Sequence, residues 1–216
     1  MADSRSNSYR PSLFYRPLSN GDTTYNSLVR TLIETKTEYK PIPGFNMNRD
    51  DTLYYRRMQE IDCDEVYPGI FIGDASTAKN REYLMRIGVT HVVNAAEGNR
   101  FGHVNTNQNY YSTTPIKYLG LPLTDLPSVD ISQYFNVVAN FIDDAIRSGG
   151  KVFVHCMLGI SRSSTCVIAF LMIKRNMTAE EAIRLVRKSR DVHPNDGFLH
   201  QLASLDNQLR RSRSYL

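Results

Sequence analysis

A tight loop near residue 156 separates two apolar segments, and this order constrains the fold more than any other feature of the chain. Residues 151–154 have the composition of a short buried strand. Residues 163–174, after the loop, carry enough apolar side chains for a helix that packs in a core. In such a unit the N–H groups of the loop converge, and the helix dipole adds positive potential there. The segment therefore predicts an α/β fold with a site for an anion such as phosphate.

Cys156 and Arg162 stand at the two ends of this loop and are the candidate reactive residues. Amide dipoles and a guanidinium lower the pKa of a thiol from its usual value of about 8.5, so Cys156 is expected to be a thiolate nucleophile. The planar fork of Arg162 matches two phosphate oxygens and stays charged at any workable pH. Gly159 frees the turn where a side chain would crowd the ligand. Ser163 places a hydroxyl beside the sulfur, and His155 is expected to order the loop by hydrogen bonding.

The backbone of the loop supplies the rest of the predicted phosphate site. The N–H groups expected to point at the phosphate belong to Met157, Leu158, Gly159, Ile160, Ser161 and Arg162. Taken singly, Cys156 also fits a small core side chain, Arg162 a surface charge, and Ser161 or Ser163 a helix N-cap. The combination of all these residues at fixed spacing favours the phosphate site.

The loop is identified as that of the cysteine-based protein tyrosine phosphatase superfamily, and its Gly-Ile-Ser-Arg-Ser half resembles dual-specificity phosphatases. Residues 64–209 resemble an atypical dual-specificity phosphatase of the vaccinia-virus-phosphatase-related type. The matching segments are Val66–Asp74, Thr90–Gly98, Tyr118–Leu121 and Pro194–Leu199. The resemblance implies a central, mainly parallel sheet flanked by helices. It also implies an enzyme that hydrolyses phosphotyrosine and phosphoserine or phosphothreonine in proteins.

A phosphatase of this kind needs an acid, since the departing oxygen of serine, threonine or tyrosine is a poor leaving group until it is protonated. Asp125 is the candidate, because it lies in a polar break after a predicted strand, in the loop where the family places its acid. An ordinary turn aspartate is the alternative, and the competing Asp130 has the position of a helix N-cap. The resemblance also implies that Ser163 assists release of the thiolate and that Asn195 helps to hold the loop.

The predicted reaction has two steps. Cys156 attacks phosphorus while Asp125 donates a proton, and water then hydrolyses the phosphocysteine with Asp125 as base. No metal or other cofactor is needed, and the five histidines and three cysteines show no metal-ligand spacing. Arg190 matches a family arginine near the pocket. It is expected either to meet a second phosphate or acidic flank of the substrate, or to be a solvated helix end.

Composition is typical of an enzyme with one core. The 216 residues, 41% of them hydrophobic, are enough for one sizeable core plus a tail. Three cysteines give no disulfide framework, and the amino terminus lacks the apolar centre of a signal peptide. No run reaches the ~20 apolar residues of a membrane span, and a net charge of +4 is too modest to favour nucleic-acid binding. These features predict a cytoplasmic or nuclear protein.

Four regions are expected along the chain. They are a disordered tail (residues 1–22), an N-terminal extension (23–60), the catalytic domain (61–209) and a basic C-terminal tail (210–216). The extension contains a helical pattern of apolar residues at Tyr25, Leu28, Val29, Leu32 and Ile33. This face is expected to dock on the catalytic domain, with partner binding as the alternative.

Strands and helices are predicted to alternate through the catalytic domain, which favours a mainly parallel sheet with helices on its faces. The predicted strands cover residues 70–72, 91–94, 117–121 and 151–154. The predicted helices cover residues 76–87, 131–147, 163–174, 178–190 and 197–209, and a capping box from Thr178 to Glu181 marks the fourth of them.

The short catalytic domain has no room for the additions that deepen the pocket of tyrosine-specific enzymes, so a shallow pocket open to all three phosphoresidues is expected. Met157, Leu158 and Ile160 are apolar where phosphoinositide phosphatases of the superfamily carry lysines, which favours a protein substrate. Mitogen-activated protein kinases are candidate substrates through the resemblance alone. The end Ser214-Tyr215-Leu216 has the form read by PDZ domains.

Two other functions stay open. One is a pseudophosphatase or adaptor that binds phosphoproteins without turnover, and the presence of Cys156, Arg162 and Asp125 weakens it. The other is a phosphatase of RNA ends or glucans. It is disfavoured because the apolar loop lacks the basic residues expected for a polyphosphate end, and because the chain lacks a carbohydrate-binding module.

Overall fold

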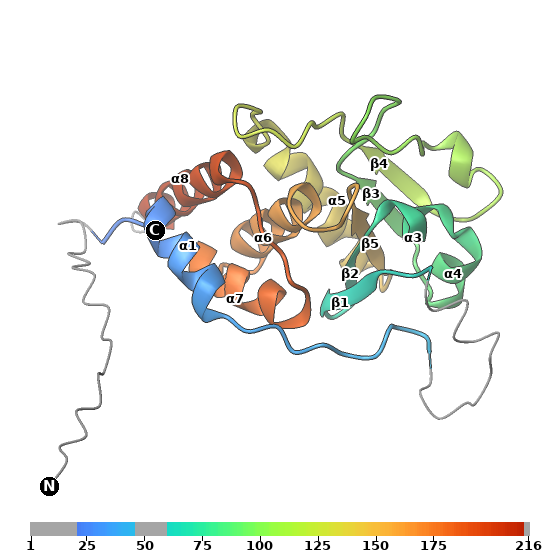
Figure 1. The fold of residues 1–216 in the computed structure, drawn as a ribbon, viewed down its shortest axis with the longest axis horizontal. Coiled ribbons are helices and arrows are strands. Elements are labelled where there is room, and N and C mark those ends of the chain that lie inside the picture. Colours follow the sequence, from blue (N-terminus) through green and yellow to red (C-terminus); the bar gives the residue numbers. More distant parts are fainter. Residues whose placement is uncertain (1–20, 46–59, 214–216) are drawn as a thin grey trace, which may run out of the picture.

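A five-stranded sheet forms the centre of the protein (Figure 1). The computed structural model describes residues 21–45 and 60–213. The strands are β1 Cys63–Tyr67, β2 Ile70–Gly73, β3 His91–Asn94, β4 Lys117–Gly120 and β5 Val152–His155, in the spatial order β1-β2-β5-β3-β4. β1 runs antiparallel to β2, and the other neighbouring strands are parallel. The predicted mainly parallel sheet is confirmed.

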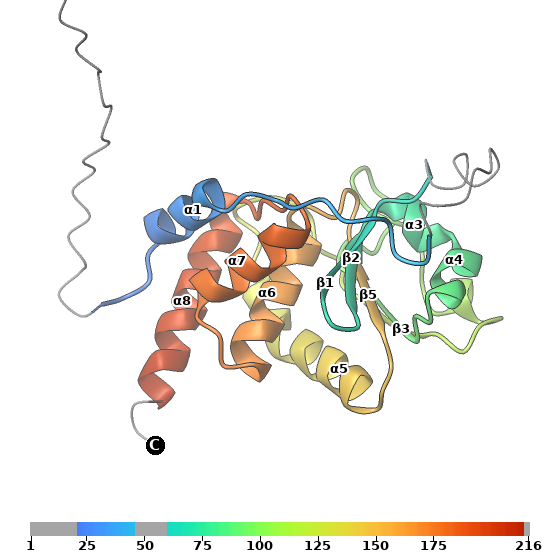
Figure 2. The ribbon, with the colours of Figure 1, turned by 90° about the horizontal axis from the view of Figure 1, so that it is seen from below.

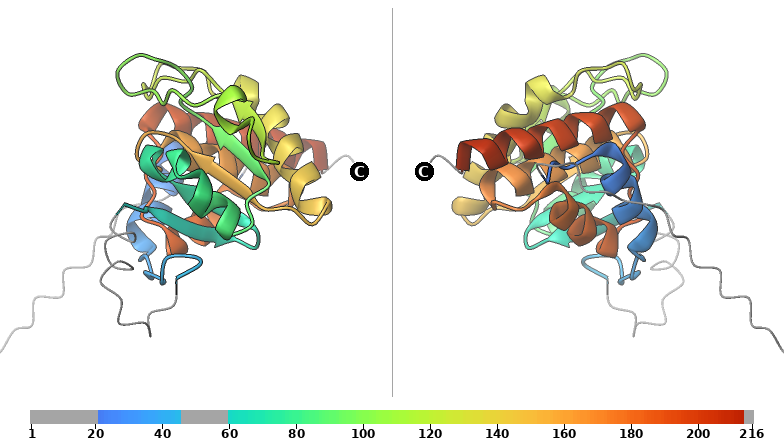
Figure 3. Two further views of the ribbon diagram at one scale, coloured as in Figure 1. Left: turned by 90° about the vertical axis from the view of Figure 1, so that its right-hand side faces the viewer. Right: turned by 90° about the vertical axis from the view of Figure 1, so that its left-hand side faces the viewer.

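Helices cover both faces of this sheet (Figures 2 and 3). One face carries α3 Ala75–Lys79 and α4 Arg81–Arg86. The other face carries α5 Phe135–Arg147, α6 Arg162–Lys174, α7 Ala179–Ser189, α8 Asp196–Arg213 and, farther out, α1 Tyr25–Glu34. Two 3₁₀ turns, Asn109–Tyr111 and Ser132–Tyr134, lie in the connections. None of the helices within the described ranges is long and apolar enough to cross a lipid bilayer.

Both faces of the central strands are buried, which explains why these strands read as unbroken apolar runs. In β5, Val152 and Val154 pack into the larger core with α5 and α6, whereas Phe153 packs into the smaller core under α3 and α4. β2 repeats this alternation. α6 is buried along most of its length, because it lies between the sheet and the helices α5, α7 and α8. The phosphate-loop segment therefore leads from the middle of the sheet into the most buried helix.

Three elements that precede the phosphate loop differ from the prediction. Residues 76–87 form two helices, because the side chain of Asn80 accepts a hydrogen bond from Tyr83 N at 2.9 Å and caps α4. Residues 131–147 begin with a 3₁₀ turn and become α-helical only at Phe135. Strand β1 is absent from the predicted elements, since two acidic residues, Asp64 and Glu65, interrupt its apolar pattern.

The C-terminal helix is longer than predicted. α8 continues to Arg213, so the prediction of a basic tail over residues 210–216 is wrong for residues 210–213. Arg213 donates to the carbonyl oxygens of Met172 at 2.7 Å and of Asn176 at 3.3 Å, which anchors the last turn of α8 against the end of α6. The predicted disordered tail, apart from its last two residues, and the PDZ-type end at residues 214–216 lie outside the described residues.

The helix of the N-terminal extension docks on the catalytic domain, as predicted. α1 packs against α7 and α8 and buries Leu28 and Leu32 completely. A capping box between Thr24 and Ser27 starts this helix. Ile33, which the sequence pattern also assigned to the buried face, is 75% exposed. The face of α1 that docks on the catalytic domain is therefore narrower than the apolar face that the sequence predicted.

Residues 35–45, here called the strap, continue from α1 past the end of α7 toward α4 (Figure 2). Glu38 N donates to Lys188 O at 2.7 Å, beside the last turn of α7. At the far end of the strap, Tyr83 Oη donates to Pro43 O at 2.9 Å. The extension therefore wraps the catalytic domain from α8 to α4.

Replacing Leu32 by alanine should destabilise the whole protein, because a buried methyl-rich side chain of α1 leaves a cavity against α7 and α8. We expect the free energy of unfolding to fall by roughly 2–5 kcal/mol. The exposed Ile33→Ala, one position along the same helix, should change it by less than about 0.5 kcal/mol. Urea denaturation followed by circular dichroism measures both, and equal effects would contradict docking of this face.

Candidate active site

The loop from Cys156 to Arg162, here called the phosphate loop, joins the end of β5 to the start of α6. Gly159 lies at its centre with a φ of +68°. A Cβ atom at this position would come within 2.5 Å of the carbonyl oxygen of Gly73 at the end of β2. Only glycine fits both the left-handed backbone and this close approach. The loop is therefore held tightly against the sheet edge where the parallel strands end.

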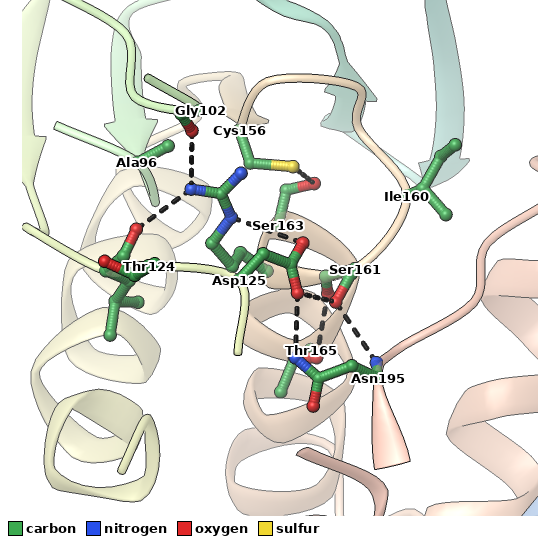
Figure 4. A network of polar contacts seen from close by, with 12 residues as sticks. Ala96, Gly102, Thr124, Asp125, Cys156, Ile160, Ser161, Ser163, Thr165 and Asn195 are labelled. Atoms are coloured by element: carbon green, nitrogen blue, oxygen red, sulfur yellow. Dashed lines mark hydrogen bonds and ion pairs between the residues drawn. The ribbon is translucent and has the colours of Figure 1, made fainter. Parts of the chain in front are cut away.

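Cys156 lies at the base of the phosphate loop and is 1% exposed. Its Sγ is 3.4 Å from Ser163 Oγ (Figure 4). Burial alone would raise the pKa of this thiol. The hydroxyl and N–H of Ser163, the charge of Arg162 and the N–H of Ile160 outweigh burial and lower the pKa below its ordinary value. The sequence predicted a low pKa, and Ser163 of α6 together with the phosphate loop provides the groups that cause it.

Arg162 is buried and fixed from one side. Its Nη1 donates to the carbonyl oxygens of Gly102 and Leu123, both at 2.9 Å. Its Nε lies 3.4 Å from Asp125 Oδ2, close enough for an ion pair but without a hydrogen-bond partner among the described residues. The two carbonyls orient the guanidinium and leave donors of its fork for an oxyanion.

Asp125 closes the site from the loop between β4 and α5, and its side chain is one-third exposed. Its Oδ1 accepts hydrogen bonds from Ser161 Oγ and Asn195 Nδ2, both at 2.8 Å (Figure 4). Asn195 N also donates to Ser161 Oγ, at 3.1 Å. The carboxylate, the phosphate loop and the turn before α8 are thus joined in one network. Asp125 lies beside the reactive loop, whereas Asp130 bonds to Ser132 within its own turn.

The role of the Ser161 hydroxyl was not apparent from the sequence, which offered this residue only as a source of a backbone N–H or as a helix cap. Its hydroxyl makes no cap bond to α6 and instead connects Asp125 with Asn195. The carbonyl acceptors of Arg162, at Gly102 and Leu123, were also missed, because backbone acceptors leave no trace in a side-chain pattern.

Arg190 lies under the phosphate loop and is 6% exposed, so the alternative of a solvated helix end is wrong. Its Nε donates to Gly159 O at 2.8 Å, and its Nη2 donates to Leu158 O at 3.0 Å. The remaining N–H groups bind Asp62 at 2.6 Å, twice, and Asp64 at 2.7 Å. All five N–H donors of the guanidinium are used.

Arg190 was predicted to be one of the groups that bind phosphate, and its position in the structure shows that this prediction is wrong. Burial works to lower its pKa, but the pairs with Asp62 and Asp64 raise that pKa further above its ordinary value, so the side chain stays charged. With every donor engaged, Arg190 supports the carbonyls of the phosphate loop from below. The two aspartates of the β1 segment are further site residues that sequence reasoning missed.

His155 also supports the loop from behind. It is fully buried, and its Nδ1 lies 3.2 Å from Cys156 O. Burial lowers the pKa of His155 to about 4, so the ring is neutral near pH 7. The side chains of Met157, Leu158 and Ile160 lie at the rim, 37%, 62% and 37% exposed. Within residues 21–45 and 60–213, no group of three or more His, Cys, Asp or Glu side chains could hold a metal ion.

Ser163→Ala should raise the pKa of Cys156, because it removes the hydroxyl that stabilises the thiolate. We expect the midpoint of the pH–rate profile for alkylation of Cys156 by iodoacetamide to rise by about one unit, equivalent to about 1.4 kcal/mol. Ser148→Ala, at the end of α5, should leave the midpoint in place. Cys63 and Cys166 will react slowly, since burial raises the pKa of each to about 12. An unchanged midpoint in Ser163→Ala would show that the hydroxyl does not stabilise the thiolate.

Comparisons with known proteins agree with this site. The family described as dual specificity phosphatase, catalytic domain, matches residues 70–208. Dual specificity protein phosphatase 13B of Mus musculus is 47% identical over 166 residues, which cover 76% of this chain and 83% of that protein. Dual specificity protein phosphatase 26 of Homo sapiens is 44% identical over 183 residues, which cover 84% of each chain. The crystal structure of human DUSP28 superposes with a TM-score of 0.60 at 28% identity, over 68% of this chain and 95% of that one. The chain belongs to the dual specificity phosphatase family.

Proposed function

We propose that this chain, as a member of the dual specificity phosphatase family, hydrolyses phosphotyrosine and phosphoserine or phosphothreonine in proteins through a phosphocysteine intermediate. The observation that carries the proposal is the position of the Cys156 thiol at the base of the phosphate loop, 3.4 Å from Ser163 Oγ and with the buried Arg162 at the other end, an arrangement that lowers the pKa of the thiol. A thiolate beside a fixed guanidinium fits nucleophilic attack on a phosphate monoester.

In the first step, Cys156 Sγ attacks phosphorus in line with the departing oxygen. The S–P bond forms while the P–O bond to the substrate breaks, and Asp125 donates its proton to the leaving oxygen. The guanidinium of Arg162 and the N–H groups of the phosphate loop stabilise the charge on the remaining phosphate oxygens. Asp125 is suited to this task because it lies at the partly exposed edge of the site, beside Arg162.

In the second step, water attacks the phosphocysteine and Asp125 accepts its proton. The S–P bond breaks, and inorganic phosphate and the Cys156 thiolate are released. Ser163, whose Oγ lies 3.4 Å from the sulfur, stabilises that thiolate as it forms. Ser161 and Asn195 act as positioning residues for Asp125, since both donate to its Oδ1.

The substrate class rests on the rim of the site. The exposed side chains of Met157, Leu158 and Ile160 are apolar and offer no cations to the additional phosphates of an inositol lipid or an RNA 5′-triphosphate. A phosphoprotein is therefore the favoured substrate. Mitogen-activated protein kinases, a PDZ-domain partner for residues 214–216 and a cytoplasmic or nuclear location remain proposals. The alternative function is a phosphoprotein-binding adaptor without turnover.

Hydrolysis of phosphotyrosyl and phosphothreonyl peptides by the wild type and by variants tests the proposal. Cys156→Ser should abolish turnover, and Asp125→Asn should lower kcat by roughly 10²–10⁴-fold because the leaving oxygen then departs unprotonated. The Asp125→Asn loss should be smaller with para-nitrophenyl phosphate, whose leaving group needs little protonation. Asp130→Asn, in the same connection but outside the network, is the matched control.

Vanadate should inhibit the wild type, because it binds where the phosphate binds. A folded wild type that binds phosphopeptides without hydrolysing them would instead establish the adaptor. Faster hydrolysis of a phosphoinositide, an RNA 5′-triphosphate or a phosphoglucan than of every phosphopeptide would refute a protein substrate.

A further inference from the structure

We propose that a pocket beside the phosphate loop binds an apolar side chain that flanks the phosphoresidue of a substrate, and that the strap forms its selective wall. This inference rests on the proposed function. The pocket has a volume of about 370 Å³. Its lining includes Tyr39, Lys40 and Ile42 of the strap, Leu158 and Ile160 of the phosphate loop, and Arg190.

The pocket adjoins the phosphate loop through two shared residues. Leu158 and Ile160 belong to both, since their N–H groups lie in the phosphate loop while their side chains line the pocket. Figure 4 shows the Ile160 side chain directed outward from the loop, away from Asp125. Consecutive residues of a peptide are 3.8 Å apart at their Cα atoms, so the neighbours of a bound phosphoresidue come within reach of these side chains.

The strap is held in place beside the pocket before any ligand arrives. Thr37 Oγ1 donates to Arg187 O at 2.9 Å, and Lys40 Nζ lies 3.4 Å from Ser189 Oγ. Tyr39 lies between these two anchored residues and is 82% exposed. An exposed aromatic side chain on a fixed backbone is a large contact surface that loses little conformational entropy on binding. The strap that carries Tyr39 is therefore held beside the pocket.

The charges of the pocket favour an apolar side chain over an acidic one. Its lining contains three carboxylates, Asp62, Asp64 and Asp191, against two cations, Lys40 and Arg190. The cation at the floor, Arg190, has no donor left, because its five N–H groups already bind the two β1-segment aspartates and the loop carbonyls. A second phosphate or an aspartate would find no free guanidinium here, and the one other cation, Lys40, is exposed to solvent, where an ion pair contributes little.

The apolar part of the lining determines the ligand class. Leu158 and Ile160 present exposed aliphatic surface on one side, and Ile42 and Tyr39 present apolar surface on the strap side. The volume accommodates a leucine or phenylalanine side chain. The strap lies outside the matched residues 70–208, so one wall of the pocket comes from the N-terminal extension and the other from the phosphate loop.

Binding of matched phosphotyrosyl peptides to the full-length Cys156→Ser variant tests the pocket without requiring turnover. The peptides carry alanine on both sides of the phosphotyrosine, and one flanking position at a time is changed to leucine or aspartate. We expect leucine at one position to tighten binding about 10-fold over alanine, as measured by fluorescence anisotropy. Aspartate at the same position should bind no more tightly than alanine.

Tyr39→Ala in the same background should reduce the leucine-to-alanine ratio of affinities to less than about 3-fold, because the wall loses its largest side chain. Ile33→Ala changes an apolar residue of α1 that lies outside the pocket and is 75% exposed, against 82% for Tyr39; it is the matched control and should keep the full ratio. Because each variant is judged by the ratio of its affinities for two peptides, a change that affects phosphate binding in general cancels.

A leucine-to-alanine ratio of affinities near one at every flanking position, or a ratio that Tyr39→Ala leaves unchanged, overturns the proposal that the pocket binds an apolar side chain. Tighter binding of aspartate than of leucine overturns it as well. Hydrolysis of the same peptides by the wild type is measured separately. Selective binding without hydrolysis would refute the proposed function and support the pocket. Hydrolysis without selective binding would support the proposed function and refute the pocket.

Discussion

A thiolate inside a protein needs neighbouring dipoles and charges, since burial by itself raises the pKa of a thiol. In this chain the groups that outweigh the burial of Cys156 are Ser163, Arg162 and the N–H groups of the phosphate loop. They act only while the loop keeps its shape, because a hydrogen bond weakens steeply when it is misaligned. The close approach of Gly159 to β2 and the hold of Arg190 on the loop carbonyls maintain that shape. The sheet edge, α6 and the end of α7 together fix the position of one sulfur atom.

Sequence patterns predicted the structural features that depend on residues close together in the chain. The strand, loop and helix around Cys156, the parallel strands and the amphipathic helix α1 all follow from apolar spacing, glycine and capping residues over short stretches. The split between α3 and α4 was missed because one side chain, Asn80, decides it. Arg190 was misassigned because its partners, Asp62 and Asp64, lie more than a hundred residues earlier. An ion pair across that distance leaves no periodic signal.

The extension combines a part that sequence predicts with a part that it does not. α1 has the spacing of an amphipathic helix and packs as such. The strap has no periodicity and takes its path from hydrogen bonds of Thr37, Glu38 and Lys40 with α7. Its position next to Leu158 and Ile160 makes it part of the surroundings of the phosphate loop. The reactive groups come from the family's matched region, and the surface around them comes partly from residues before it.

The contacts of Arg190 also show that the phosphate loop depends on residues that precede the family match. A chain trimmed to the matched residues 70–208 would lose Asp62 and Asp64 while keeping Arg190. Arg190 would then lose both carboxylate partners, of which Asp64 is 22% and Asp62 52% exposed. The guanidinium would be held less firmly against the carbonyls of Leu158 and Gly159, which are part of the phosphate loop itself. A fragment of this chain that keeps both carboxylates under the phosphate loop therefore has to begin before β1, ahead of the first residue of the family match.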